Sequence, residues 1–230
     1  MTKSNVSAEN KIPSQAELIS LLECYQAGRF SDAEKLAQSF TEKFPQHPFA
    51  WKMLGAILGQ TGRLSDSLAY MQKSVQLSPQ DAEAYNNLGN VLKALGRLNE
   101  AEASYKQAIT LKPDYAEAHS NLGNTLKGLG KSDEAEASYR QAITLRSDFA
   151  EAHSNLGNVL KALGRLNEAE ASYRQAITLR PDYAEAYSNL GATLKELGRL
   201  DEAEASCKQA VFLKPDYAEA RYNLGLCLFY

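Results

Sequence analysis

The residues that could carry out catalysis or hold a metal ion are few and scattered. The 230-residue chain contains three histidines and three cysteines, which are His47, His119, His153, Cys24, Cys207 and Cys227. No two cysteines form a Cys-x-x-Cys pair, and no set of these side chains has the spacing of zinc ligands. Sparse, odd-numbered cysteines favour reduced thiols in a cytosol-like compartment. We therefore predict a cytoplasmic, non-catalytic chain with no metal site and no cofactor.

Composition excludes two further classes of partner. The formal net charge is −3, with 25 basic and 28 acidic residues, which argues against a nucleic-acid-binding protein. Hydrophobic residues make up 44% of the chain, but none of them form a continuous apolar run of about 18 residues, so we predict no membrane span. The polar residues 1–13 lack the apolar segment of a secretion signal and are expected to be a disordered leader.

Asparagines and lysines are the polar residues that do recur in a pattern, with a period of 34 residues. The asparagines are Asn87, Asn121, Asn155, Asn189 and Asn223, and, three residues beyond the first members, Asn90, Asn124 and Asn158. The lysines are Lys93, Lys127, Lys161 and Lys195. An amide side chain both donates and accepts hydrogen bonds, so it can pair with a peptide backbone. We treat these twelve residues as candidate peptide-binding groups, and leave open the alternative that the asparagines only tie adjacent helices together.

The same period organises the whole chain into units of two helices. We number the positions of each unit as slots, with Ala82 as slot one. In 82–115, apolar residues at slots four, seven, eight and eleven predict a first helix that ends before Gly96, and slots two, five, six, nine, twelve and thirteen form its opposite face. A second helix follows and stops at Pro113. Small residues such as Gly89, Ala101 and Ala108 are expected to let the two helices approach closely.

Helix starts are predicted from pairs of residues that resemble capping boxes. Asn99 stands three residues before Glu102, at the expected start of the second helix. The corresponding pairs for first helices are Asp114/Glu117, Asp148/Glu151, Asp182/Glu185 and Asp216/Glu219. Each acid or amide is expected to accept a hydrogen bond from the first turn of its helix.

This pattern resembles the tetratricopeptide repeat. The resemblance rests on Trp51-x-x-Leu54-Gly55 and on Ala101-x-x-x-Tyr105 followed by Ala108. It implies an all-α fold, a right-handed α-solenoid of stacked antiparallel helix pairs over residues 14–230. The expected units are 14–47 (a degenerate capping repeat), 48–81, 82–115, 116–149, 150–183, 184–217 and a partial unit, 218–230.

The resemblance also implies where the candidate residues lie. The first helix of each pair lines the concave side in this family, so slots six and nine would form an asparagine floor. Slot two, which is Glu83 in one unit, would form an acidic rim, and slot twelve, with Lys93, a basic one, about 15 Å away along the helix. Arginines just beyond slot twelve, such as Arg165 and Arg199, would extend the basic rim. We therefore predict a protein-protein interaction scaffold that binds extended peptide segments along an Asn-lined groove.

One alternative function and one excluded mode follow from the resemblance. The asparagine ladders resemble the superhelix of O-linked N-acetylglucosamine transferases, so the chain could recruit substrate for a protein O-glycosyltransferase whose catalytic domain it lacks. The carboxylate clamp of chaperone-tail adaptors is rejected. Lys52 and Asn87 fit that clamp, but Glu117 stands where a basic residue is required.

The last helix, 218–230, carries apolar residues at slots that are polar in earlier units. Leu226 and Phe229 occupy two such slots, whereas Leu224 and Leu228 are expected to pack on the unit 184–217. Apolar surface of this kind marks interaction sites. We therefore expect weak self-association through the C-terminal helix.

Overall fold

The computed structural model describes residues 12–228, with side chains up to residue 227, and this part of the chain contains thirteen α-helices and no strand. The helices are α1 (Gln15–Gln26), α2 (Phe30–Lys43), α3 (Pro48–Gln60), α4 (Leu64–Leu77), α5 (Ala82–Ala94), α6 (Leu98–Leu111), α7 (Ala116–Gly128), α8 (Ser132–Leu145), α9 (Ala150–Ala162), α10 (Leu166–Leu179), α11 (Ala184–Glu196), α12 (Leu200–Leu213) and α13 (Ala218–Leu228). Most of the expected leader, residues 1–11, the expected exposure of Phe229 and the expected packing of the Leu228 side chain lie outside the described residues.

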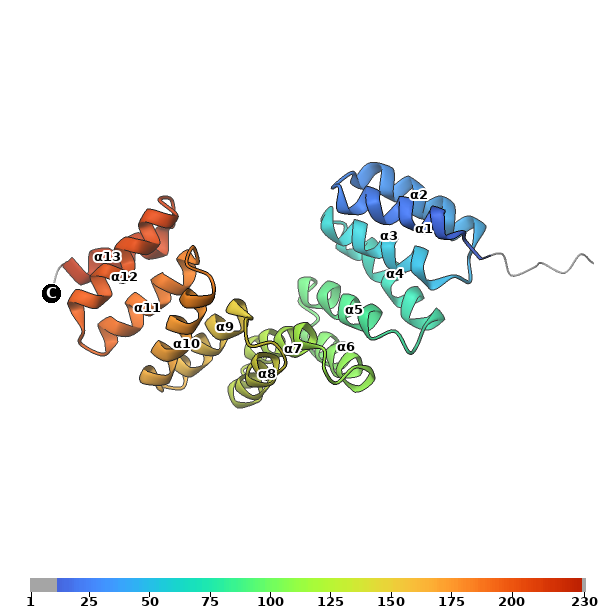
Figure 1. The fold of residues 1–230 in the computed structure, drawn as a ribbon. Helices are drawn as coiled ribbons and strands as arrows, with labels where there is room; N and C mark the ends of the chain where they lie inside the picture. The colour runs from blue at the N-terminus through green and yellow to red at the C-terminus, as the bar shows by residue number, and fades with distance from the viewer. Residues whose placement is uncertain (1–11, 229–230) are drawn as a thin grey trace, which may run out of the picture. The chain divides into compact units, whose positions relative to one another are not determined.

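The helices pack in consecutive pairs, and the pairs stack within two units (Figure 1). Unit 1, Met1–Pro113, holds α1 to α6, and its pairs are joined by the contacts of α2 with α3 and of α4 with α5. Unit 2, Asp114–Tyr230, holds α7 to α13, and its pairs are joined through α8 with α9, α10 with α11 and α12 with α13. The predicted all-α solenoid of helix pairs is confirmed.

The first helices from α1 to α11 each end at a glycine with left-handed backbone geometry, as predicted. Gly96 has φ +74°, and the chain reverses there as the Gly96 and Arg97 amides donate to the carbonyls of Lys93 and Leu92, both at 2.9 Å. A residue with a Cβ would be strained at this φ, whereas glycine is not. The turn therefore fixes where the second helix of the pair begins.

Within a pair, the two helices approach at a glycine that faces a buried ring. A Cβ on Gly89 would lie 2.6 Å from Cε1 of Tyr105, so only glycine fits against this side chain. Tyr105, Ala101 and Ala108 are all fully buried. The prediction that small residues permit close approach of the helices is confirmed.

The capping boxes predicted at Asn99, Asp114, Asp148 and Asp182 are wrong. Helix α6 begins at Leu98 with Arg97 as its N-cap, so Asn99 lies within the first turn and caps nothing. Helices α7, α9 and α11 have Tyr115, Phe149 and Tyr183 as N-caps, with no side-chain hydrogen bond at the cap. The acid that precedes each of these aromatic residues comes one position too early to cap the helix.

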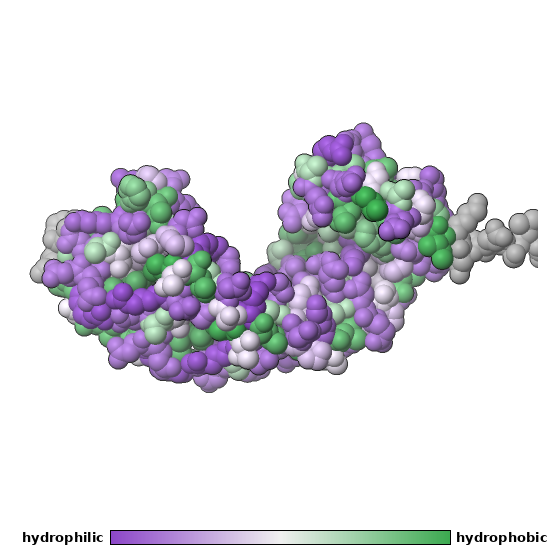
Figure 2. All heavy atoms as spheres, viewed as in Figure 1, coloured by the Kyte–Doolittle hydropathy of each residue, from purple (hydrophilic) through white to green (hydrophobic). Residues whose placement is uncertain are grey.

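Helix α5 differs from these helices because an acidic residue stands at its N-cap position itself. Its N-cap is Asp81, in the position that an aromatic residue occupies in the later repeats, and its Oδ1 accepts a hydrogen bond from the Ala84 amide at 3.0 Å. A Ser14–Glu17 capping box, which sequence reasoning did not single out, also starts α1. On the face shown in Figure 2, hydrophilic residues cover most of the surface of both units and hydrophobic residues lie among them in small clusters.

Candidate functional site

The slot-six asparagines lie half-buried on the first helices, and in unit 2 some of them bond to the preceding repeat. The Asn189 amide donates to Oδ1 of Asn158 at 3.1 Å, and the Asn223 amide donates to Oγ of Ser188 at 3.1 Å. Asn155 makes no side-chain hydrogen bond to any described residue. The contacts of Asn189 and Asn223 therefore agree with the alternative that these amides tie adjacent repeats together, whereas the Asn155 amide is free to bind a ligand.

The slot-nine asparagines form hydrogen bonds with buried tyrosines of their own repeat. The hydroxyls of Tyr105, Tyr139 and Tyr173 donate to Oδ1 of Asn90, Asn124 and Asn158 at 2.8, 2.9 and 2.8 Å. Because the oxygen is engaged by the tyrosine, the Nδ2 group of each asparagine remains available to donate a hydrogen bond elsewhere. As peptide-binding groups, these side chains would serve as donors to carbonyl oxygens.

The sequence carried a signal for this pairing that was missed. In the three full units that lack the tyrosine, the slot-nine asparagine is absent too: Leu22 accompanies Ala37, Ala56 accompanies Met71, and Ala192 accompanies Cys207. The two positions therefore change together within this one chain.

Slot five does not belong to the exposed face to which it was assigned. Asn86, Ser120, Ser154 and Ser188 are between 0% and 5% exposed. The first helices thus bury a wider stripe than the apolar residues alone indicated, because small polar side chains share the packing face.

The slot-twelve lysines differ from one another. Burial lowers the pKa of Lys93, which is half-buried on α5. Lys127 is exposed, Lys161 forms an ion pair with Glu196 at 3.1 Å, and Lys195 is half-buried on α11. These four lysines therefore do not form a uniform row of free positive charge.

Glutamates of the expected acidic rim are neutralised by basic side chains of the same repeat. The slot-two glutamates Glu117 and Glu151 pair with Arg146 and Arg180, at 2.5 and 2.6 Å. Arg146 and Arg180 in turn stack on the rings that stand at the N-caps, Phe149 and Tyr183, at 3.6 and 3.5 Å from the ring centres.

The arginines expected in the basic rim face the second helices instead. Arg165 contacts Glu136 at 2.7 Å and Glu168 at 2.6 Å, and Arg140 contacts the same two carboxylates at 2.9 and 3.3 Å. This closed ring of four charges joins α8 to α10. The set Arg174, Glu170, Arg199 and Glu202 repeats it between α10 and α12.

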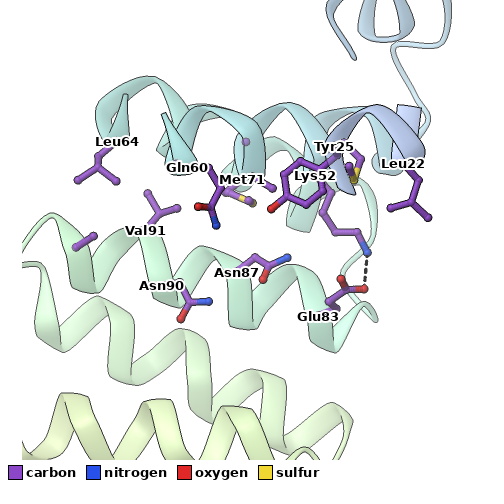
Figure 3. Close-up of a pocket in the computed structure, with 15 residues that line it drawn as sticks. Leu22, Tyr25, Lys52, Gln60, Leu64, Met71, Glu83, Asn87, Asn90 and Val91 are labelled. Atoms are coloured by element: carbon purple, nitrogen blue, oxygen red, sulfur yellow. Dashed lines mark hydrogen bonds and ion pairs between the residues drawn. The ribbon is translucent and has the colours of Figure 1, made fainter. Parts of the chain in front are cut away.

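A pocket of about 440 Å³ lies in unit 1 between α1, α3 and α5 (Figure 3). Asn87 and Asn90 of α5 face Gln60 of α3 across it, and Met53, Ala56 and Val91 contribute apolar surface. This pocket brings together two of the predicted asparagines and a set of residues from 14–47 and 48–81 that sequence reasoning did not single out.

One end of the pocket is charged. The Lys52 ammonium lies 2.9 Å from Oε2 of Glu83 and 3.1 Å from Oδ2 of Asp81 (Figure 3). Burial by itself lowers the pKa of Lys52, but the hydrogen bonds and negative charges of Glu83 and Asp81 more than offset this and raise it. The ammonium is thus held by this chain's own carboxylates, which further separates the site from a carboxylate clamp.

The histidines and cysteines occupy packing positions. His153 lies at slot four, and its Nε2 is 3.2 Å from the Ser147 carbonyl; burial chiefly lowers its pKa. Trp51, in the same slot, donates to the Pro45 carbonyl at 3.0 Å. The three cysteines are buried thiols, and burial, with Cys227 nearby, raises the pKa of Cys207 to about 12.

The described residues contain neither a metal-binding group of side chains nor a membrane-spanning helix. No group of three or more histidine, cysteine, aspartate or glutamate side chains is arranged to hold a metal ion in residues 12–227. Over the same part of the chain, no helix has the length and apolar character needed to cross a bilayer.

Family models match almost the whole repeat region. Models described as tetratricopeptide repeat match residues 24–82, 70–103 and 184–217, and one described as TPR repeat matches 89–130, 126–164 and 157–198. The chain therefore belongs to the tetratricopeptide repeat family. No curated protein matched the sequence.

Solved structures with the same fold include three of different origin. PilW, a type IV pilus biogenesis factor, superposes with a TM-score of 0.83 at 20% identity, over 92% of this chain and 100% of PilW. TTC0263, a thermophilic TPR protein of Thermus thermophilus, gives 0.63 at 27% identity, over 80% and 100%. YrrB, a protein with an unusual peptide-binding site, gives 0.65 at 22% identity, over 81% and 96%. The resemblance to glycosyltransferase superhelices is not established by these matches.

Proposed function

We propose that this chain is a protein-interaction scaffold that binds extended peptide segments along the asparagine-bearing faces of its first helices. The observation that carries the proposal is the set of half-buried amides at slots six and nine, of which the slot-nine side chains accept hydrogen bonds from buried tyrosines. YrrB, which shares the fold, has a peptide-binding site and supports this assignment.

The geometry gives the two rows different roles. The Oδ1 atoms of Asn90, Asn124 and Asn158 are engaged by tyrosine hydroxyls, so these side chains offer N–H donors to carbonyl groups of a peptide. A free slot-six amide, as at Asn155, can both donate and accept. An extended peptide has a carbonyl and an amide at every residue, so amides in register suit a backbone more than any particular side chain.

The test is a selection of random twelve-residue peptides displayed on phage, with the full chain as bait. Selected peptides are then labelled and titrated by fluorescence anisotropy. Changing Asn87, Asn121, Asn155 and Asn189 together to Ala should weaken binding at least tenfold and leave helicity nearly unchanged. If stability falls as much as affinity, the slot-six asparagines are structural ties. Failure to select any peptide would contradict the proposed function.

A second arm examines the lysines at slot twelve. The Lys127 side chain is exposed, so any contribution that it makes to capture is screened by salt. The affinity of selected peptides should fall between low and high ionic strength, and a Lys127→Gln variant should show less of this fall. A fall of equal size in the variant would remove Lys127 from the mechanism.

A further inference from the structure

The first two repeats depart from the asparagine and lysine pattern at the same three slots. Slots six, nine and twelve are Asn, Asn and Lys in the units that begin at 82, 116 and 150. In the two preceding units they are Ile19, Leu22 and Tyr25, and then Met53, Ala56 and Gly59. Ile19 and Leu22, three residues apart on α1, are 46% and 38% exposed. The face that is polar in later repeats is apolar here.

These differences from the later repeats leave space for the pocket between α1, α3 and α5. Ala56 and Gly59 are short where later repeats carry Asn and Lys, so the α3 side of the pocket has room for a guest side chain. Leu22 lies at one end of it in Figure 3, and Tyr25 lies over its middle. Met53 and Met71 add unbranched, adaptable side chains that can repack around ligands of different shape.

The charges at the pocket's end are unbalanced. Lys52 supplies one positive charge against the two carboxylates of Asp81 and Glu83, and the Glu83 side chain is 62% exposed. An additional cation beside Glu83 would meet net negative charge. An anionic group would meet the same charge unfavourably.

We propose that this pocket, which we call the α1–α3–α5 pocket, recognises a partner peptide by one or two large apolar side chains such as Leu, Met or Phe, followed by a Lys or Arg near Glu83. The inference rests on the proposed function and adds sequence preference to it, since the asparagine rows by themselves select none. The alternative occupant within this chain is residues 1–11, which carry Met1 and Val6 as large apolar residues and Lys3 and Lys11 as cations, and their deletion forms one arm of the test below.

The chain provides its own matched controls for a test. Leu22→Asn with Ala56→Asn restores the residue that other repeats carry at slot nine, at two positions that are already solvent-accessible. Ala192→Asn makes the same substitution in α11, outside the pocket. The phage selection is run in parallel with the wild-type chain, the pocket variant and the control, and helicity is compared for all three.

Peptides selected by the wild type and by Ala192→Asn should be enriched in a large apolar residue with Lys or Arg nearby, and the pocket variant should lose this enrichment. Replacing the apolar residue of a selected peptide by Ser should weaken its binding to the wild type at least tenfold, as expected for loss of a buried aliphatic side chain. This peptide-side change requires no protein variant, so it does not depend on how the variant folds.

Peptides that bind without apolar enrichment, or that tolerate the Ser change, would overturn the inference and leave the proposed function intact. Binding that appears only after residues 1–11 are deleted would identify the chain's own N-terminal segment as the occupant and also overturn it. No selection by any of the proteins would contradict both proposals.

Discussion

At the scale of single residues, the recurring asparagines are best understood together with the side chains behind them. Tyr139 is fully buried, and its hydroxyl reaches Oδ1 of Asn124 at 2.9 Å. A buried hydroxyl without a partner costs free energy, so a repeat that keeps the tyrosine also keeps the asparagine. In the units where Met71 or Cys207 replaces the ring, alanine at slot nine carries no such cost. Recurrence of an asparagine is therefore partly structural even on a surface proposed to bind ligand.

We expect Asn124→Ala to destabilise the protein by about 1–3 kcal/mol, because it leaves the Tyr139 hydroxyl buried without an acceptor. The measurement is urea unfolding followed by circular dichroism. In a Tyr139→Phe background the same Asn124→Ala change should cost much less, since no hydroxyl remains to be satisfied. Equal costs in both backgrounds would show that the hydrogen bond contributes little.

The same tyrosines predict a loss of stability at alkaline pH. Burial raises the pKa of Tyr105, Tyr139 and Tyr173 above the usual value of 10.0. Below pH 10 these groups are neutral in both the folded and the unfolded chain, so their contribution to the free energy of unfolding is fully present. Above pH 10 only the unfolded chain ionises readily, and stability should fall by up to about 1.4 kcal/mol per pH unit for each tyrosine.

Unfolding midpoints in urea at pH 8, 9, 10 and 11 check this expectation. Tyr139→Phe should show a shallower decline above pH 10 than the wild type, because one titrating group has been removed. Parallel declines for the two proteins would mean that the lysines or other groups govern alkaline unfolding.

At the scale of helices, the period of apolar residues predicted where helices exist, but not how each one starts. The glycine series and the close packing at Gly89 follow from local spacing and side-chain size, so both could be predicted. The caps could not, because Asp114 and its equivalents stand one residue too early and the aromatic residue after them takes the N-cap. The charge rings between α8, α10 and α12 also escaped prediction, since their members lie up to 29 residues apart along the chain.

Two glycines of α7 should respond in opposite ways to the same substitution. A Cβ on Gly123 would lie 2.8 Å from Cε1 of Tyr139, whose buried ring has little room to move, so Gly123→Ala should cost about 1–3 kcal/mol. Gly128 is exposed, and its equivalents in α5 and α9 are Ala94 and Ala162, so Gly128→Ala should stabilise by up to about 1 kcal/mol.

Thermal and urea unfolding of the two single variants provide the measurement. The comparison is internal, because both changes add one methyl group to the same helix. Stabilisation by Gly123→Ala would show that α7 and α8 can separate enough to admit a methyl group, contrary to the packing described above.

At the scale of the whole chain, repetition is what made the fold and the asparagine rows predictable. The units repeat every 34 residues, so the helix boundaries and slot positions inferred for one unit apply to the others. The α1–α3–α5 pocket escaped because it depends on where the period breaks, at Leu22, Ala56 and Gly59, and a departure from a repeat was interpreted as degeneration of the first unit. The pocket also requires three helices to be placed side by side, which spacing along one helix does not give.

Helix α13 also departs from the repeat pattern, because Tyr222 stands at slot five. In the four repeats that begin at 82, 116, 150 and 184 this slot is at most 5% exposed, with Ser188 fully buried, whereas Tyr222 is 67% exposed. An apolar ring on a face that elsewhere packs against another helix is suited to pack against a second molecule. We therefore expect the weak self-association predicted for the C-terminal helix to depend on Tyr222.

Sedimentation-velocity ultracentrifugation over a range of protein concentrations measures this association. Tyr222→Ser, which restores the residue found at slot five in α7, α9 and α11, should shift the chain toward monomer. Phe212→Thr is the matched control, because Phe212 is 77% exposed and stands where Thr110, Thr144 and Thr178 stand in other repeats, but on a second helix. It removes a comparable exposed ring and should leave the association unchanged. If both variants associate like the wild type, or the wild type remains monomeric at the highest concentration, the slot-five face of α13 is not a self-association surface.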